Sequence, residues 1–139
     1  MGRRGPPRFH VSWWMPRWVV VRNRSRSGLP VVRARWCSSF PCKLRGLSLR
    51  RSLPPETGLM LVESRDGRWT TSIHMFGMLF AIGVVWIDGR GTVVDARRAS
   101  PWRVYLPAAP ARFTLEGSPE ILERAAVGEE LEFAEDSHA

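Results

Sequence analysis

A predicted β-hairpin at residues 82–96 constrains the fold of this 139-residue chain more than any other feature. Two runs rich in β-branched residues, 82–87 and 92–96, flank the sequence DGRG at 88–91. Glycine supplies the positive φ that tight turns need, so this pattern predicts an antiparallel hairpin. The hairpin ends the most apolar stretch of the chain, residues 70–95, and we therefore expect it at the centre of the hydrophobic core.

Short apolar runs on both sides of this hairpin predict further strands. The run at 18–21 and the alternating run at 31–36 are separated by a polar turn and predict a second hairpin. Within residues 112–116, Phe113 and Leu115 alternate with polar residues and are expected to face inward. Other short strands are predicted at residues 59–62, 71–75 and 131–133.

Two short helices complete the predicted elements. Ser38 and Ser39 offer an N-cap for a helix that ends at Gly46, and the sequence SPE at 118–120 begins another that ends by Gly128. Residues 101–110 contain three prolines and predict an extended surface loop. The whole pattern indicates a mainly β fold, a small antiparallel barrel or sandwich with two short helices.

The length of the chain fits one domain with a single core. We expect a basic, tryptophan-containing tail at residues 1–17, a single β domain at 18–134 and a C-terminal tail at 135–139. Met15 is an alternative to Met1 as the initiating residue.

No targeting or membrane segment is predicted. An apolar segment of ~7–15 residues, as in a signal peptide, does not follow the first arginines. The longest apolar run, 75–87, is shorter than the ~20 residues that span a bilayer. The sequence therefore predicts a cytoplasmic protein.

Charge is divided unevenly along the chain. Residues 1–55 contain thirteen Lys and Arg and no acid, whereas residues 56–139 contain eight Arg and thirteen acidic residues. A basic segment of this kind attracts nucleic acid, acidic partners or anionic lipid. The alternative is a solvated arginine-rich extension. Tryptophans that could stack on single-stranded nucleic acid lie among these arginines: Trp13, Trp14, Trp18 and Trp36.

His74 with Met75 and Met78 forms a candidate metal cluster, because imidazole and thioethers suit copper, and a thiolate from Cys37 or Cys42 could complete the set. The alternative is that the methionines fill the core and that His74 is hydrogen-bonded there. The two cysteines alone do not fill a structural zinc site, which usually takes four ligands. In a cytoplasmic protein both are expected to be reduced, with a local disulfide or a redox pair as the alternative.

A hydrolytic enzyme would pair His74 with either cysteine and orient the imidazole with a carboxylate such as Asp88 or Asp95. Both aspartates have a simpler role at the ends of the predicted hairpin. The chain contains no nucleophile elbow and no phosphate loop, because the glycines of the 88–91 turn precede a strand rather than a helix. We therefore predict no cofactor and favour a protein that is not an enzyme.

An aromatic and basic loop is the better candidate for binding. Trp102, Arg103 and Tyr105, framed by prolines, could stack on a ring or contact a sugar or a peptide. The alternative is that Trp102 and the prolines pack over an open end of the barrel. With His74, these three residues are the predicted binding residues.

A series of short motifs runs from about residue 31 to residue 133. These are KLRGL at 43–47, GLMLV at 58–62, SIHM at 72–75 with Met78, VVWID at 84–88 with VV at 93–94, PARFTLE at 110–116 and VGE at 127–129. In order and spacing they resemble the domain of unknown function 192 family. The resemblance implies a compact, mostly β fold and no established activity. Gly83 stands where many members have an aspartate after a proline-leucine pair, and Ser48 stands where a methionine often follows the Gly-Leu pair.

These features favour a non-enzymatic ligand-binding or accessory domain with an unknown ligand or protein partner. One alternative is a small metal-binding or hydrolytic enzyme, which should place a cysteine within hydrogen-bonding reach of His74. Another is nucleic-acid binding through the basic residues 1–55. A binding module should instead expose His74, Trp102 and Arg103 together.

Overall fold

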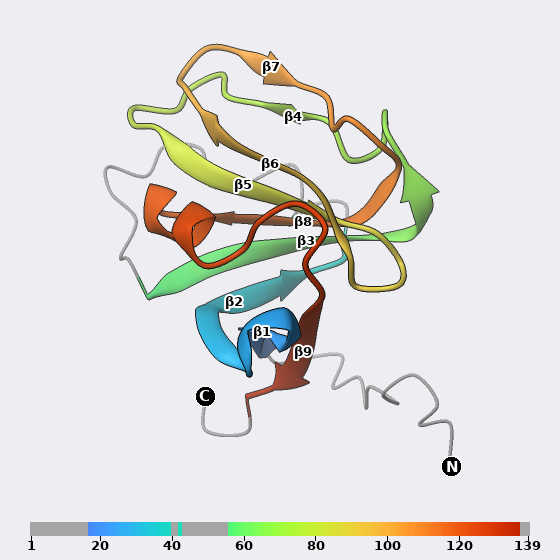
Figure 1. The fold of residues 1–139 in the computed structure, drawn as a ribbon. Helices are drawn as coiled ribbons and strands as arrows, with labels where there is room; N and C mark the ends of the chain where they lie inside the picture. Colours follow the sequence, from blue (N-terminus) through green and yellow to red (C-terminus); the bar gives the residue numbers. More distant parts are fainter. Residues whose placement is uncertain (1–16, 40–41, 43–55, 137–139) are drawn as a thin grey trace.

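The computed structural model describes residues 17–39, 42 and 56–136. In this part of the chain, nine strands form two sheets (Figure 1). The larger sheet has seven strands in the order β6-β5-β8-β3-β2-β1-β9, and the smaller one pairs β4 with β7. The predicted mainly β fold is confirmed. The strands are β1 (Trp18–Asn23), β2 (Leu29–Cys37), β3 (Thr57–Gly67), β4 (Ile73–His74), β5 (Ile82–Ile87), β6 (Val93–Ala99), β7 (Val104–Tyr105), β8 (Ala111–Gly117) and β9 (Leu131–Glu135).

Both predicted hairpins are confirmed. β5 and β6 pair antiparallel, and at their turn Asp88 Oδ1 accepts hydrogen bonds from the backbone N of Arg90 (2.9 Å) and Thr92 (3.0 Å). Gly91 has a φ of 93°, a region that glycine enters without strain. β1 and β2 also pair antiparallel, on either side of the 3-10 helix η1 (Arg24–Arg26).

Several boundaries differ from the prediction. β3 continues to Gly67 and β6 to Ala99, whereas the predicted strand at 71–75 shortens to the two residues of β4. The predicted loop at 101–110 contains β7. β9 includes Glu135, the first residue of the predicted C-terminal tail. These limits depend on the partner strands, which local sequence does not specify.

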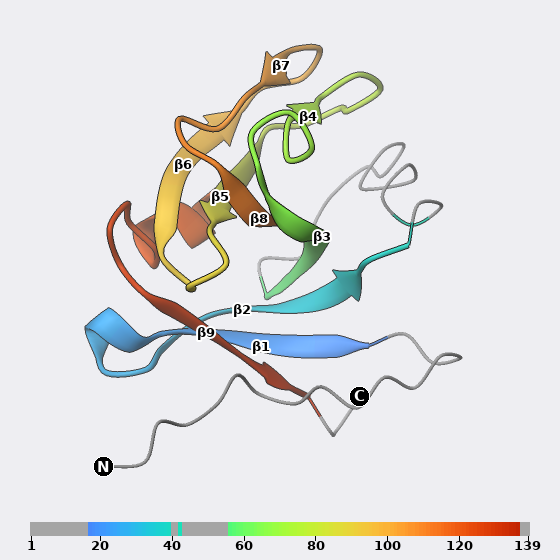
Figure 2. The same cartoon turned by 90° about the vertical axis from the view of Figure 1, so that its right-hand side faces the viewer.

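The seven-stranded sheet curls into a half-barrel (Figure 2). At one end its two edges meet, because Thr92 before β6 and Glu130 before β9 form an antiparallel bridge. The backbone N of Leu131 also donates to the carbonyl of Gly91 at 2.8 Å. The predicted central hairpin therefore closes one end of the sheet.

β2 and β3 are parallel, a local departure from the predicted antiparallel barrel or sandwich. Parallel neighbours need a crossover of a dozen or more residues, and residues 38–56 provide that length. The helix predicted to end at Gly46 falls in this connection. It lies outside the described residues, apart from Ser38, Ser39 and Cys42.

The core consists of two hydrophobic clusters. Val85 and Leu115 belong to one, and Val84 and Trp86 belong to the other, so alternate residues of β5 face opposite clusters. All six residues of β5 are buried, which explains why this strand reads as a continuous apolar run. Trp86 is fully buried, and its indole Nε1 donates to the carbonyl of Thr71 at 2.7 Å.

The second predicted helix is a short 3-10 helix, η2 (Pro119–Glu123), and does not extend towards Gly128. The backbone N of Gly128 donates to the carbonyl of Val93 at 2.8 Å, and the N of Val93 donates to the carbonyl of Glu129 at 2.9 Å. The chain after η2 is therefore hydrogen-bonded to β6 instead of continuing as a helix.

Cys37 and Cys42 form a disulfide, which corrects the prediction of two reduced thiols. The chain turns back at the end of β2 and brings the two Cα atoms to 5.7 Å, within the range that disulfides require. Cys37 is buried in the cluster that also contains Trp86.

Candidate functional site

The small β4–β7 sheet brings the four predicted binding residues onto one two-stranded ribbon. Ile73 pairs with Tyr105 and His74 with Val104. Beyond the paired residues, the backbone N of Met75 donates to the carbonyl of Arg103 (2.7 Å), and the N of Trp102 donates to the carbonyl of Met75 (2.8 Å). Residues about thirty positions apart in sequence are thus held side by side.

Strand alternation divides this ribbon into an inner and an outer side. Ile73 and Met75 are 6% and 2% exposed and pack in the core. The outer side carries the exposed residues between them and opposite them, which we call the ribbon face: His74, Phe76, Trp102 and Val104. Phe76 and Val104 were not among the predicted site residues. The i, i+2 spacing of Phe76 from His74 was the signal that could have identified it.

The rings of the ribbon face contact one another. The imidazole of His74 stacks on Phe76 with a centroid distance of 5.3 Å and an interplanar angle of 22°. Phe76 lies 6.4 Å from the Trp102 ring. Trp102 is 65% exposed and has a φ of 66°, a left-handed conformation that bulky residues seldom adopt. The fold therefore exposes the Trp102 indole although the backbone conformation of this residue is unfavourable for tryptophan.

The other two predicted binding residues have different environments. Tyr105 is half-buried against the core, and its hydroxyl accepts a hydrogen bond from the backbone N of Ser100 at 2.8 Å. Tyr105 therefore anchors the inner side of the ribbon to the core. The Arg103 side chain is exposed, while its backbone carbonyl holds the ribbon together.

The chain around the ribbon face is basic and contains no acid. Residues 67–81 and 96–110 include Arg68, Arg97, Arg98 and Arg103 but no Asp or Glu. Asp95, the residue before the second segment, already has partners. Its Oδ2 accepts hydrogen bonds from Arg97 Nη2 and from the backbone N of Ala108, both at 2.9 Å. Three of these four arginines have no carboxylate partner in the part of the chain that the structure describes.

The basic β1–β2 hairpin lies at the opposite end of the molecule from β4 and β7 (Figures 1 and 2). Four of the six arginines at positions 17–35 are paired with the acidic segment at and around β9. The pairs are Arg17–Glu135 (4.0 Å), Arg24–Glu132 (4.0 Å), Arg26–Glu129 (2.8 Å) and Arg33–Asp136 (2.6 Å). The fold thus pairs four of the thirteen basic residues of positions 1–55, seven of which lie outside the described residues.

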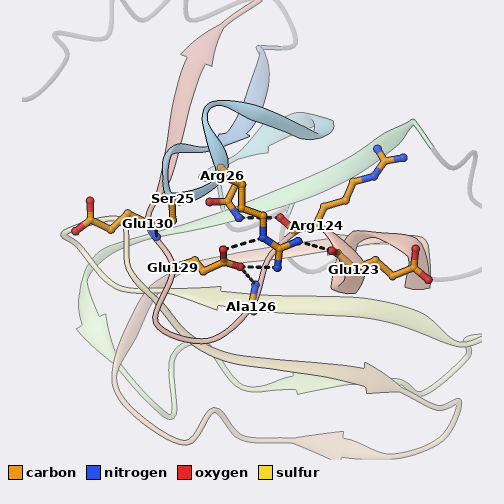
Figure 3. A network of polar contacts seen from close by, with 8 residues as sticks. Ser25, Arg26, Glu123, Arg124, Ala126, Glu129 and Glu130 are labelled. Atoms are coloured by element: carbon orange, nitrogen blue, oxygen red, sulfur yellow. Dashed lines mark hydrogen bonds and ion pairs between the residues drawn. The ribbon is translucent and has the colours of Figure 1, made fainter.

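Arg26 is the centre of a polar network between the hairpin turn and the η2–β9 connection (Figure 3). Its Nε and Nη2 donate to the two carboxylate oxygens of Glu129, each at 2.8 Å, and its Nη1 donates to the carbonyl of Glu123 at 2.7 Å. Glu129 also accepts from the backbone N of Ala126 at 2.7 Å. The hydrogen bond from Arg26 lowers the pKa of Glu129, and the same contact raises the pKa of Arg26.

The predicted metal and nucleophile residues are only partly brought together. Cys37, Met75 and Met78 share one buried cluster, against which Cys42 packs, but the side chain of His74 is exposed on the ribbon face. The disulfide occupies both thiols, so neither offers a thiolate while it is formed. Within the described ranges, no group of three or more His, Cys, Asp and Glu side chains is arranged to hold a metal ion. The metal-binding and hydrolytic predictions that combine His74 with a cysteine therefore stay predictions, and they apply only to a chain in which the disulfide is reduced.

Glu116 is a buried carboxyl group that the sequence pattern did not reveal. Phe113 and Leu115 of β8 face inward as predicted, but the opposite face of β8 is also covered, and Glu116 is only 7% exposed. It lies between Leu59 of β3 and Val84 of β5. Loss of hydration raises the pKa of Glu116 from 4.5 to about 7.

Gly83, where family members often carry an aspartate, is tightly packed. A Cβ atom at this position would lie 2.8 Å from the carbonyl of Ser118 and 2.8 Å from Cγ1 of Ile121. An aspartate would therefore displace η2. Ser48, the other departure from the family pattern, lies outside the described residues.

No helix in the described part of the chain is long and apolar enough to cross a membrane.

Proteins named UPF0127 are similar to this chain in sequence. A protein named UPF0127 from Thermococcus sibiricus is 30% identical over 116 residues, which cover 82% of this chain and 74% of that protein. The UPF0127 protein of Pyrococcus horikoshii is 36% identical over 98 residues, which cover 70% of this chain and 83% of that protein.

Two solved structures share the fold. A Sinorhizobium meliloti 1021 protein, provisionally described as a transcription regulator, has a TM-score of 0.72 at 18% identity, covering 90% of this chain and 98% of its own. A protein of unknown function from Novosphingobium aromaticivorans has a TM-score of 0.69 at 17% identity, covering 93% and 94%. The model of the domain of unknown function 192 family, described as "Uncharacterized ACR", matches residues 20–133. This chain therefore belongs to the domain of unknown function 192 family.

Proposed function

We propose that this protein is a non-enzymatic binding module whose ribbon face takes an anionic ligand that carries a flat ring. The observation that supports this most directly is the exposed row of three rings, His74, Phe76 and Trp102. A contiguous apolar and aromatic surface of this kind is typical of interaction sites. The ribbon is held in place by the Tyr105 hydroxyl, by the backbone carbonyl of Arg103 and by packing on the core cluster.

The conformation of Trp102 supports a role in binding rather than in packing. A left-handed backbone costs a bulky residue about 1–2 kcal/mol, and a 65% exposed indole recovers little of this by burial in the free protein. A bound ring stacked on the indole would recover it. Val104, which is 62% exposed next to these rings, would also be covered by such a ligand.

The charge around the ribbon face favours an anion. Arg103 and Arg68, whose Nε donates to the carbonyl of Pro107, lie in two segments that contain no carboxylate, so a cationic ligand would be repelled. Guanidinium groups bind carboxylates and phosphates through directed hydrogen bonds. The ligand class that fits both features is an aromatic or base-containing anion.

A titration with two ligands that share one ring tests this proposal. Indole-3-acetate and tryptamine differ in the sign of their charge but not in the indole. In two-dimensional 15N spectra, indole-3-acetate should shift the amides of residues 73–76 and 102–105, and tryptamine should shift them far less. Shifts elsewhere only, or equal shifts with both compounds, would contradict the proposal.

Two variants locate the effect. Trp102→Gly removes the indole and also relieves the positive φ, so this variant should fold and should lose the indole-3-acetate response. Trp69→Ala is the matched control, because Trp69 is a second exposed tryptophan (81%) that is not part of the ribbon face. This variant should keep the indole-3-acetate response.

The alternative of a metal-binding or hydrolytic protein depends on reduced cysteines, because Cys37 and Cys42 are bonded to each other. A stable disulfide is also uncommon in the cytoplasm, where this protein is predicted to lie. Alkylation of free thiols in intact cells, followed by mass spectrometry, measures whether Cys37 and Cys42 are reduced or bonded to each other in the cell. Full alkylation of both cysteines would keep the alternative open, and complete protection would remove it.

A further inference from the structure

We propose that the ligand of the ribbon face is single-stranded nucleic acid. This inference rests on the proposed function and assigns the class of anion that the ribbon face binds. It also moves the nucleic-acid site away from the basic N-terminal half, where the composition of the sequence suggested it.

The aromatic and basic groups of the β1–β2 hairpin are already used inside the fold. The guanidinium of Arg33 lies 4.1 Å from the centroid of the Trp18 ring, and that of Arg17 lies 5.6 Å from that of Trp36. Trp36 also contacts Phe113, with ring centroids 6.0 Å apart. Carboxylates at and around β9 neutralise four of the six arginines between positions 17 and 35. Among the described residues of this end, only Arg22 and Arg35 lack a carboxylate partner, and the rings of Trp18 and Trp36 are in contact with other side chains.

The ribbon end has the opposite character. Its rings are exposed on one side, and their centroids follow one another at 5.3 Å and 6.4 Å, from His74 through Phe76 to Trp102. Arg103, next to Trp102 in sequence, is exposed and lacks a carboxylate partner among the residues described. Aromatic platforms flanked by positive charge are the common means of binding single strands, since every base has a face that can stack.

The arrangement favours a single strand over a duplex. Bases in a duplex are stacked on each other and do not offer their faces, whereas unpaired bases can stack on side chains. An acidic protein segment is the other anionic polymer that could meet this charge. It would not require the rings, so the experiment distinguishes the two.

Fluorescence anisotropy with a fluorescein-labelled dT20 oligonucleotide and the full chain tests the assignment. We expect binding at ~50 mM KCl that weakens steeply by ~200 mM. Trp102→Gly should weaken binding about tenfold through the loss of stacking. Arg103→Ala should weaken it several-fold and lower the slope of log affinity against log salt by about one.

Matched arginine changes at the other end provide the control. Arg22 and Arg35 are exposed hairpin residues without a carboxylate partner in the described structure, so Arg22→Ala with Arg35→Ala removes twice the charge that Arg103→Ala removes. This double variant should change dT20 affinity less than twofold. If it abolishes binding while the ribbon variants do not, the site lies elsewhere and the inference is wrong.

Two further results would overturn the assignment. Polyglutamate that competes as well as dT20 at equal charge would show that the rings are not used and that an acidic polymer suffices. Absence of dT20 binding at ~50 mM KCl, together with a normal response to indole-3-acetate, would reject nucleic acid while leaving the proposed function intact.

Discussion

At the scale of single residues, Glu116 shows that a polar side chain in a strand is buried when both faces of a curled sheet are covered. The carboxyl group lies on a buried face of β8 between Leu59 and Val84. Burial is the single cause of its raised pKa, so the neutral form is favoured in the folded state. In the unfolded chain this group has its ordinary value of 4.5. Glu116 therefore makes folding dependent on pH.

The sign of this dependence follows from the two pKa values. Between 4.5 and about 7 the folded state holds a proton that the unfolded state has released, so stability falls as pH rises through this range. Glu116→Gln should therefore raise the free energy of unfolding by about 3 kcal/mol at pH 8, and far less at pH 4. Urea denaturation at both pH values measures the difference. The exposed Glu120→Gln is the control, and an equal gain for Glu116→Gln at both pH values would contradict the prediction.

At the scale of elements, the Arg26 network ties the β1–β2 turn to the connection that leads into β9. The guanidinium makes a two-bonded contact with Glu129 and also holds the carbonyl of Glu123 (Figure 3). Lysine carries the same charge but cannot reproduce this fork. The contribution of the network should therefore depend on geometry more than on charge.

Arg26→Lys and Glu129→Gln should each lower the melting temperature, and the double variant should lose little more than the larger single loss. Because the pKa of Glu129 is lowered, its contribution is present above its ordinary value of 4.5 and is lost as pH falls through its folded pKa. The difference between the wild type and Glu129→Gln should therefore close in acid. Arg24→Lys is the control, because Arg24 and Glu132 are 4.0 Å apart and more than half exposed. Equal losses for Arg24→Lys and Arg26→Lys would contradict this assignment.

At the scale of the whole molecule, the two ends have different electrostatic roles. Four of the six arginines at positions 17–35 pair with the acidic segment around β9, while Arg103 of the ribbon has no acidic partner among the described residues. The overall charge of +8 is therefore not a guide to where an anion would bind. In the proposed function, the site depends on which of the described arginines are paired.

Release of a hairpin arginine should create a second anion site. Glu132 is exposed and pairs with Arg24 at 4.0 Å, so Glu132→Gln should leave the fold intact. This variant should bind dT20 more tightly, with a salt slope steeper by about one. This added affinity should persist when Trp102→Gly is introduced. An unchanged slope would show that this ion pair does not mask the hairpin.

Much of the fold could be predicted from local sequence. The β5–β6 hairpin follows from the glycines of its turn, and the β1–β2 hairpin follows from the alternation at 31–36. The residues of the ribbon were also identified in part, because Trp102 and Arg103 stand out in a loop rich in proline. Phe76 was missed because it lies in an apolar run, where only its i, i+2 spacing from His74 indicates that its ring is exposed.

What the sequence by itself determined is therefore the set of strands, the two hairpins and the chemical types present in the ribbon. The tertiary structure alone decided that His74 lies opposite Val104, that β2 and β3 are parallel, and that Glu116 is buried on the second face of β8. It also decided that arginines near the start of the chain are neutralised by acids more than one hundred positions away. Local patterns specify turns and strand faces. Pairing between distant segments depends on how the whole sheet curls, which no short stretch of sequence encodes.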